Sequence, residues 1–580
     1  MSPLRSLVLG LFLLLTDLSA QEIHTTLFVN IPDDRLDVSM KVPSFDDDDA
    51  TFCLPAWAPG NYRVLNFGKW IQGFSALDTA GLPLPVIRVD INTWHIKQAR
   101  RLANITYSVL DIPEDSVEAL PTTLNDLDSN LLYFNATTVF GYFTNKSTSK
   151  YNVRYLLPSG WRVWCALPFD TVYHADSYDQ LVDSPVLAGD GHLETARFMV
   201  DSTTFEFVVS SAREIPVDSL IAVTEPVVRF QASLFGGLPF RTYFFLMVFS
   251  NHGTRFGALE HRASSAYYLP QPSAQRDIRT SFYSRVLAHE LFHAWLPKRI
   301  HPKAIEELNY QDSLRIKTMW VIEGITEYYA KLSLVRSGIL PPSYLYQEIR
   351  GLVLDNLEDN LETLSLRSAE TGVAAPMYTK GALMGLLIDI EIRRKTKNRK
   401  SLDDVLKYMD KQNRVYDDNN FSGVVKKATG VNIQTILNDY VKGSKYIPVE
   451  PFLRSAGIRY DFLYRPFFGW TFDVDEDNQL FVTTTTKEST SDDLKLESGD
   501  IILEIQHQKL IGDLDQIRES VGSLEQLKVG ESVRLVVLRN DKTLELQSSV
   551  RAHPTPELRV VENTKASPAE KKILNGLLGR

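Results

Sequence analysis

Residues 285–300 read RVLAHELFHAWLPKRI, an apolar segment with two histidines four positions apart. His289 and His293 are two of only 11 histidines among 580 residues, and Glu290 directly follows the first. In an α-helix, residues i and i+4 lie on one face, so both imidazoles can point at one place. This is the H-E-x-x-H pattern, in which the histidines bind a metal and the glutamate lies beside it. Composition alone would produce the pattern in roughly one such chain in a hundred, so it needs support from its surroundings.

The next helical segment supplies that support. A catalytic zinc takes three protein ligands and leaves one position for water. Residues 320–330 read WVIEGITEYYA, and a helix–loop–helix return can bring Glu323 to the two histidines. Glu327, one turn further on, either accepts the free N–H of a ligand histidine or is a solvent-facing charge. We therefore predict one zinc ion per chain, bound by His289, His293 and Glu323.

Hydrophobic periodicity places these motifs in a mainly helical region from about 280 to 455. Residues 281–296 have helical spacing and stop at a proline, and a second helix is expected from Asp312 or Ser313 to Gly338. Strand patterns flank this region on both sides. Alternating β-branched and aromatic residues predict an antiparallel β domain before it, and short strands return after about 465.

Length and composition limit the classes of protein that fit. A chain of 580 residues is expected to form two to four domains. Its hydrophobic fraction of 44% and aromatic fraction of 11% are typical of globular domains with packed cores. The net charge of −10 argues against nucleic-acid binding, which needs a basic surface. Cys53 and Cys165 are too few for a zinc ribbon, and they either form a disulfide or remain buried thiols.

The first 20 residues have the pattern of a secretory signal peptide. Arg5 precedes an apolar run at 7–15 that is too short to span a bilayer, and a small residue stands before Gln21. We expect cleavage there and a secreted or periplasmic protein, with an uncleaved membrane anchor as the alternative. No later stretch is long and apolar enough to cross a membrane, so no integral span is expected after signal removal.

The chain resembles the gluzincin zinc metallopeptidases and, among them, the glycyl aminopeptidase family. H-E-x-x-H followed by E-G-x-T-x-Y-Y carries the resemblance, and three longer segments agree with it. They are HELFHAWLPKRIHP at 289–302, PAWAPGNYRV at 55–64 and YTKGALMGLLIDIEIR at 378–393. The family ends in a PDZ domain, and the C-terminal strand-rich block resembles one. The resemblance implies an aminopeptidase with a narrow preference for small first residues, glycine or alanine.

The expected architecture is a multidomain α+β protein with a thermolysin-like catalytic domain. Its predicted parts are a signal peptide (1–20), an N-terminal antiparallel β domain (21–215), a zinc metallopeptidase domain (216–460), a PDZ-like domain (461–555) and a charged, loosely held tail (556–580).

Peptide hydrolysis also needs groups beyond the metal ligands. Glu290 is the expected general base, which takes a proton from water and passes it to the leaving amine. The resemblance gives the role of oxyanion donor to Tyr378, whose alternative is a packed core tyrosine. The resemblance also implies that GALEH at 257–261 contains an edge strand that binds substrate and ends in Glu260, which would bind the substrate's amine. The alternative is that Glu260 is an ordinary glutamate at the end of a strand. In that strand, Gly257 and Ala258 would let a peptide backbone approach closely.

The PDZ-like block suggests a second place for peptides. SGDIILEIQHQKL at 498–510 matches the PDZ pattern of a Gly-Asp turn before an apolar strand. FFGW at 467–470 could be the loop whose amides hold a peptide carboxylate, or the block could simply cover the catalytic domain. The partners expected from sequence are therefore peptide substrates and peptide C-termini. Two other functions stay open, a zinc endopeptidase or broader peptidase on the same scaffold and a non-catalytic peptide-binding protein.

Overall fold

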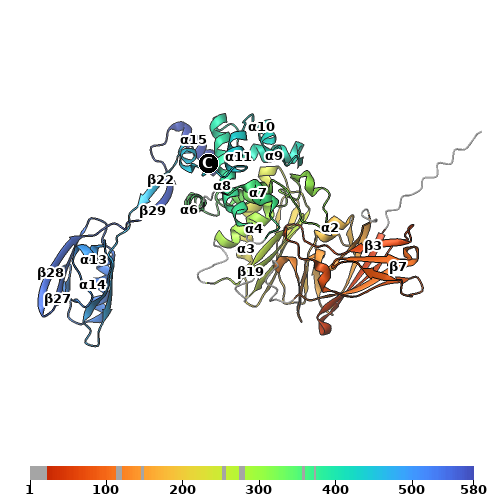
Figure 1. Ribbon diagram of the computed structural model, residues 1–580, viewed down its shortest axis with the longest axis horizontal. Coiled ribbons are helices and arrows are strands. Elements are labelled where there is room, and N and C mark those ends of the chain that lie inside the picture. Colours follow the sequence, from red (N-terminus) through yellow and green to blue (C-terminus); the bar gives the residue numbers. More distant parts are fainter. Residues whose placement is uncertain are drawn as a thin grey trace, which may run out of the picture. The chain divides into compact units, whose positions relative to one another are not determined.

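The computed structural model describes residues 22–112, 121–144, 149–250, 256–273, 281–355, 359–370 and 374–580 (Figure 1). The predicted signal peptide lies outside these residues. The chain divides into two compact units. The larger comprises residues 1–345, 352–452 and 572–580, and the smaller comprises 346–351 and 453–571.

Three sheets form the N-terminal part of the larger unit. The first has the order β13 (Tyr173–Ala175), β11 (Lys150–Leu156), β1 (Glu22–Asn30), β2 (Arg35–Lys41), β7 (Leu102–Leu110) and β4 (Ile71–Asp78). The second has the order β10 (Tyr142–Phe143), β3 (Asp49–Cys53), β6 (Thr93–Lys97) and β5 (Val86–Arg88). The third has the order β12 (Arg162–Trp164), β14 (Val186–Gly189), β9 (Leu131–Phe134) and β8 (Asn125–Leu127). Short helices α1 (Ala136–Val139) and α2 (Tyr178–Val182) lie between strands in the chain.

Alternating burial explains how these strands make a core. β1 and β2 each bury every second side chain, the pattern of a sheet with one face covered. The β-rich prediction is thus correct, but the pairing is not purely antiparallel, because β1 and β11 run parallel. Cys53 and Cys165 are both buried free thiols, so they do not form the disulfide that the sequence left open.

A fourth sheet crosses the predicted domain boundary at 215. Its order is β15 (Glu194–Val200), β16 (Thr203–Ser211), β17 (Thr242–Ser250), β19 (Ser264–Pro270) and β18 (Gly257–Glu260). β16 pairs in parallel with β17, and the crossover between them is helix α3 (Val217–Phe235). The first two strands therefore belong to one sheet with β17, β18 and β19, and the strand pattern at 194–211 could not reveal this because the pairing is long-range.

The helices that carry the predicted motifs follow this sheet. They are α4 (Ser281–Phe292), a π-helical turn η6 (Val321–Ile325), α5 (Thr326–Arg336) and α8 (Ala375–Thr396). The remaining elements of this part are β20 (His301–Pro302), α6 (Pro342–Leu354), α7 (Leu361–Leu366), α9 (Leu402–Gln412), β21 (Val415–Tyr416), α10 (Phe421–Thr429), α11 (Gln434–Tyr440) and α12 (Val449–Ser455).

Two helix boundaries differ from the sequence prediction. The second helix does not begin at Asp312 or Ser313, because residues 313–316 have no helical structure and lead Ile316 into a buried cluster. The first helix ends at Phe292 rather than at 296, and turns follow. In both cases tertiary packing overrides local propensity.

Close backbone packing joins η6 to α8. A Cβ added to Gly324 would lie 2.4 Å from backbone atoms of Gly381, so only a residue without a side chain allows this approach. The contact brings the N-terminal turns of α8, including Tyr378, against the turn that carries Glu323.

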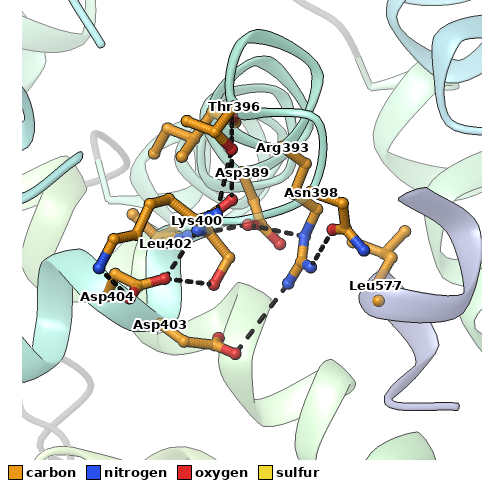
Figure 2. A network of polar contacts seen from close by, with 12 residues as sticks. Asp389, Arg393, Thr396, Asn398, Lys400, Leu402, Asp403, Asp404 and Leu577 are labelled. Carbon is orange, nitrogen blue, oxygen red and sulfur yellow. Dashed lines mark hydrogen bonds and ion pairs between the residues drawn. The ribbon is translucent and has the colours of Figure 1, made fainter. Parts of the chain in front are cut away.

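A buried polar network holds the other end of α8 (Figure 2). Asp389 is fully buried; it accepts hydrogen bonds from Arg393 and from the Leu402 amide. Arg393 also bonds Asn398, whose amide donates to the Lys572 carbonyl 2.8 Å away. This last bond reaches helix α15 (Pro568–Leu578).

The C-terminal segment is not the loosely held tail that its charge suggested. It forms strand β29 (Glu557–Glu562) and helix α15 (Pro568–Leu578). Leu574 and Leu577 on α15 are buried, and Arg336 donates to the Leu577 carbonyl at 2.9 Å. An apolar stripe among the charges therefore anchors the end of the chain to the larger unit.

The smaller unit contains a six-stranded sheet packed against helix α14 (Leu514–Glu525) and a separate two-stranded ribbon. The sheet order is β23 (Trp470–Val474), β24 (Leu480–Thr485), β25 (Ile501–Ile505), β27 (Ser532–Arg539) and β28 (Lys542–Ser549), with β26 (Gln508–Lys509) paired to β25. Helices α13 (Thr490–Asp493) and α14 (Leu514–Glu525) lie between strands in the chain, and β22 (Ile458–Leu463) pairs with β29 as a separate ribbon. Apolar side chains from the sheet and α14 share one core.

Among the described residues, none of the helices combines the length and the apolar character that a bilayer crossing requires.

Candidate metal centre

The two histidines of the opening motif converge in a buried position. His289 is 7% exposed and His293 is 2% exposed. Although α4 ends at Phe292, the His293 amide still donates to the His289 carbonyl at 3.3 Å, so the i, i+4 relation persists. The Nε2 atoms of the two rings are 3.0 Å apart.

Partners at the opposite ring nitrogens set the tautomer of each histidine. Nδ1 of His289 lies 3.0 Å from Oε2 of Glu327, and Nδ1 of His293 lies 2.6 Å from the Leu296 carbonyl oxygen. Both partners are acceptors, so each Nδ1 carries the proton and donates it. Each Nε2 is then left with a lone pair, and the two lone pairs face one another.

Glu323 completes a triangle of acceptors. Its Oε2 lies 3.5 Å from Nε2 of both histidines and has no hydrogen-bond partner among the residues that the structure describes. The point equidistant from the three atoms is about 1.9 Å from each, near the roughly 2.0–2.1 Å that zinc keeps from imidazole nitrogen. Three converging electron pairs in a buried site are unfavourable without a cation, so these residues fit a zinc ion.

Glu323 lies in the π-helical turn η6. Such turns are rare and occur often at functional sites. Glu323 and Glu327 both face His289 from this element and the start of α5, at 3.5 Å and 3.0 Å. The sequence prediction of a solvent-facing alternative for Glu327 does not describe the structure, since this side chain is 5% exposed.

Basic residues keep the Glu327 carboxylate charged. Burial by itself would raise its pKa, but Lys331, the His289 hydrogen bond and Arg285 together hold the pKa below its ordinary value. Both Lys331 and Arg285 donate to Oε1, which leaves Oε2 for His289. A charged acceptor of this kind orients a ligand imidazole and strengthens its lone pair.

Two further carboxylates lie beside the triangle. Oxygen atoms of Glu260 and Glu290 and a ring nitrogen of His293 all lie within 4.8 Å of one another. Glu260 is 4% exposed and Glu290 is 7% exposed. Burial raises the pKa of Glu290 to about 7.

Tyr378 reaches the same centre from α8. Its ring stacks on the His289 imidazole, with centroids 5.7 Å apart and planes inclined by 28°. Burial and the carboxylates of Glu323 and Glu290 raise the pKa of Tyr378 well above its usual value, so the phenol remains protonated.

Glu260 ends a strand at the edge of the catalytic sheet. β18 pairs with β19 on one side and is the last strand in the sheet order, so its other side is an edge. An edge strand can pair with an extended peptide. Gly257 and Ala258 lie on this strand, which puts all three predicted substrate-binding residues on one element.

Two site neighbours were not identified from sequence. Tyr62 donates a hydrogen bond to Oε1 of Glu323 at 3.0 Å, and a Cβ added to Gly60 would lie 2.7 Å from Oε2 of Glu260. Both belong to the PGNY turn at 59–62, in the segment PAWAPGNYRV. The sequence predicts a turn at Pro59–Asn61 but no role in the site, and this turn directly before a tyrosine was the available signal.

A pocket of about 280 Å³ lies beside Glu260. Its lining includes Trp57, Gly60, Tyr62, Glu260, Lys298 and Tyr310. Lys298 Nζ lies 2.9 Å from Asp183 and 4.0 Å from Glu260, so its charge is already paired at the pocket wall. The buried His261, which the chemistry did not require, also contacts Asp183, at 3.3 Å.

A buried His-His-Glu triangle with an adjacent glutamate defines a metallopeptidase-type centre. Residues 25–190 match the model of the Peptidase M61 N-terminal domain, and residues 283–383 match the model described as M61 glycyl aminopeptidase. Together with the geometry of the centre, these matches support a zinc metallopeptidase, and the matched parts of the chain are similar to M61 peptidases.

One solved structure shares the fold, and a second has a lower similarity. An aminopeptidase N family protein from Idiomarina loihiensis is 22% identical, with a TM-score of 0.72 over 96% of this chain and 100% of that chain. An M1 zinc metallopeptidase from Deinococcus radiodurans is 14% identical, with a TM-score of 0.48 over 74% of this chain and 95% of that chain. No curated protein matches the chain at a significant level.

Proposed function

We propose that this protein is a zinc aminopeptidase that releases a small first residue, glycine or alanine, from peptides. The observation that carries the proposal is the position of Glu260 beside the metal triangle, within 4.8 Å of Glu290 and His293. A peptide's α-amine nitrogen is two bonds, roughly 2.5 Å, from its first carbonyl carbon. A carboxylate that binds the amine must therefore lie a few ångströms from the metal, as Glu260 does.

The surroundings of Glu260 favour an exopeptidase over an endopeptidase. Gly60 approaches the Glu260 carboxylate so closely that even a methyl group would collide with it. The PGNY turn thus occupies space next to the position proposed for the substrate's amine. An endopeptidase would need that space for the substrate residues that precede the cleaved bond. An ammonium group there would be held by a charge-assisted hydrogen bond to Glu260.

The chain's own residues can perform the proton transfers. Glu290 accepts a proton from the attacking water on a carboxylate oxygen and returns it to the leaving amine nitrogen. The Tyr378 hydroxyl donates a hydrogen bond to the oxyanion that forms on the scissile carbonyl. Glu327 holds His289 with its Nε2 directed at the ion. His289, His293 and Glu323 would hold the zinc ion, which would acidify a water and polarise the carbonyl.

The family description names glycine and thus supports a small first residue, and alanine is proposed because it is the next smallest. A pocket of about 280 Å³ next to Glu260 could admit larger groups. A zinc endopeptidase or broader peptidase is the second candidate for this reason. We also propose a secreted or periplasmic location, which is supported by the signal-peptide pattern at 1–20.

For the smaller unit we propose a PDZ-like domain that binds peptide C-termini. β23 is the first strand in its sheet order and therefore has a free edge, and FFGW directly precedes and enters it. Gly469 has a φ of +71°, which a glycine adopts without strain. A peptide could add to β23 with its carboxylate at this turn. If the larger unit were not catalytic, peptide binding by this unit would make the chain a non-catalytic peptide-binding protein, which is the third candidate function.

One substrate pair tests the leading proposal. The purified chain should contain one zinc and hydrolyse glycyl-p-nitroanilide, while N-acetylglycyl-p-nitroanilide should remain intact. Glu260→Gln should raise KM for the free amine with zinc content unchanged. Cleavage of the acetylated substrate that survives Glu260→Gln would establish the endopeptidase alternative. A zinc-loaded chain inactive on both, and on longer peptides, would favour a binding protein.

A further inference from the structure

The N-terminal β domain supplies a hydrogen bond to the proposed metal ligand Glu323. The Tyr62 hydroxyl donates to Oε1 of Glu323 at 3.0 Å, across 261 positions of sequence. Tyr62 is 9% exposed and Glu323 is 2% exposed, so water does not compete strongly for this bond. The second carboxylate oxygen, Oε2, accepts no hydrogen bond from any described residue and faces the two histidines.

This arrangement gives the two oxygens of Glu323 different tasks. A carboxylate with two free oxygens can bind a metal through either one or through both. With Oε1 engaged by a hydroxyl, only Oε2 keeps its lone pairs directed at the histidine nitrogens. Rotation of the carboxylate would break the Tyr62 hydrogen bond, so that bond favours one orientation.

Tyr62 packs against the segment that carries Glu323. Its ring belongs to a buried cluster with Met377 and with Ile316, Met319 and Ile322, three residues on the segment that carries Glu323. The cluster thus couples the ring to the element whose carboxylate its hydroxyl contacts.

Hydrogen bonds to two backbone carbonyls fix the loop that presents Tyr62. The Trp57 indole donates to the Asn309 carbonyl at 2.9 Å, and the Ala56 amide donates to the Tyr310 carbonyl at 2.7 Å. These contacts join the N-terminal β domain to the chain that leads into η6. The position of the tyrosine is therefore determined from both sides.

We propose that Tyr62 is a positioning residue that makes Glu323 a one-oxygen ligand, so that the N-terminal β domain completes the metal centre. The inference rests on the proposed function, because it takes His289, His293 and Glu323 as the zinc ligands. Tyr62 would not touch the substrate's reacting atoms. Its effect would pass through Glu323 to the affinity and coordination of the ion.

Zinc affinity of the full chain tests the proposal. Tyr62→Phe removes only the hydroxyl, and groups that orient ligands contribute roughly 10–100-fold to metal affinity. We expect competition with a chromogenic chelator to show a loss of that size. Tyr310→Phe is the matched control, since its hydroxyl also bonds a carboxylate, Asp179 at 2.5 Å, but not a ligand of the metal. It should bind zinc like the wild type, and equal affinity in the two variants would overturn the proposal.

Cobalt substitution gives a second readout that a general loss of stability would not change. In Co²⁺-loaded Tyr62→Phe, release of Oε1 should raise the coordination number and weaken the visible absorption bands relative to the wild type and Tyr310→Phe. An unchanged spectrum would exclude the positioning role even if the variant is less stable.

The variant His289→Ala distinguishes a failure of the proposed zinc site from a failure of the proposed role of Tyr62. If His289→Ala binds zinc as tightly as the wild type, the metal site itself is wrongly assigned. If His289→Ala loses zinc while Tyr62→Phe keeps full affinity and an unchanged cobalt spectrum, the metal site stands and only the role of Tyr62 fails.

Discussion

Two buried polar clusters share helices α5 and α8, and they differ in whether their charges are paired. At the network in Figure 2, Asp389 accepts from Arg393 at 3.1 Å and from the Leu402 amide at 2.8 Å, and the Tyr328 hydroxyl adds a third bond at 2.8 Å. The buried Asp389 carboxylate thus receives three hydrogen bonds, all from donors in this chain. Its charge is compensated without a bound ion or ligand.

At the metal centre the balance is different. Two Nε2 atoms and Oε2 of Glu323 approach within 3.0–3.5 Å, and all three are acceptors. Glu327 accepts the Nδ1 proton of His289, and Tyr62 donates to the other oxygen of Glu323. Both contacts leave the lone pairs of the facing atoms free. The comparison teaches that buried charge alone does not mark a functional site; the mark is a set of acceptors whose missing partner is a cation.

The largest expected effect separates chemistry from binding at the centre. Glu290→Gln keeps the shape of the side chain but cannot accept a proton. We expect kcat to fall roughly 10²–10⁴-fold while zinc content stays at one per chain. Metal analysis and turnover of glycyl-p-nitroanilide measure both quantities. Near-normal turnover would remove Glu290 from the role of general base.

The opposite result is expected at the paired network. Asp389→Ala leaves Arg393 buried with its main partner gone, which should cost about 3–5 kcal/mol of stability. Urea unfolding measures the loss, and the folded fraction should still bind zinc. Asn360→Ala, at the N-cap of α7 and outside this network, is the control and should cost about 1 kcal/mol. Equal losses in both variants would mean that the network is not structural.

The variant Tyr378→Phe tests whether Tyr378 acts in catalysis or only in packing. If the hydroxyl donates to the oxyanion, kcat should fall roughly 10²–10³-fold with little change in KM. Thermal unfolding should be close to that of the wild type, since the ring and its stacking on His289 are kept. A variant with normal kcat but lower stability would identify a packed core tyrosine instead.

The smallest effect is expected at Glu327, where the two clusters meet on α5. Glu327→Gln removes the charge that orients His289, and zinc affinity should weaken roughly 10–100-fold. Chelator competition measures the loss, and turnover at saturating zinc should recover in large part. Unchanged affinity would assign Glu327 to the ion pairs with Arg285 and Lys331 alone.

Local patterns carried much of the prediction. Helical spacing at 281–296 put His289 and His293 on one face, and alternation at the N-terminus predicted the β-rich sheets. These inferences hold because they depend on neighbours within four residues. The same reasoning misplaced the start of the helix before Glu323, because residues 313–316 follow the buried cluster around Ile316 rather than their own propensity.

The amino-acid sequence alone was enough for the metal motif, because two histidines one helical turn apart need no partner from elsewhere to share a face. It could not show that Tyr62 contacts Glu323, that Gly60 lies against Glu260, or that β16 joins the sheet of β17. Each of these contacts joins residues far apart in the chain, and such contacts form only when whole elements pack. In this protein, local periodicity places the two histidines on one face, and long-range packing determines how they are oriented and which side chains surround them.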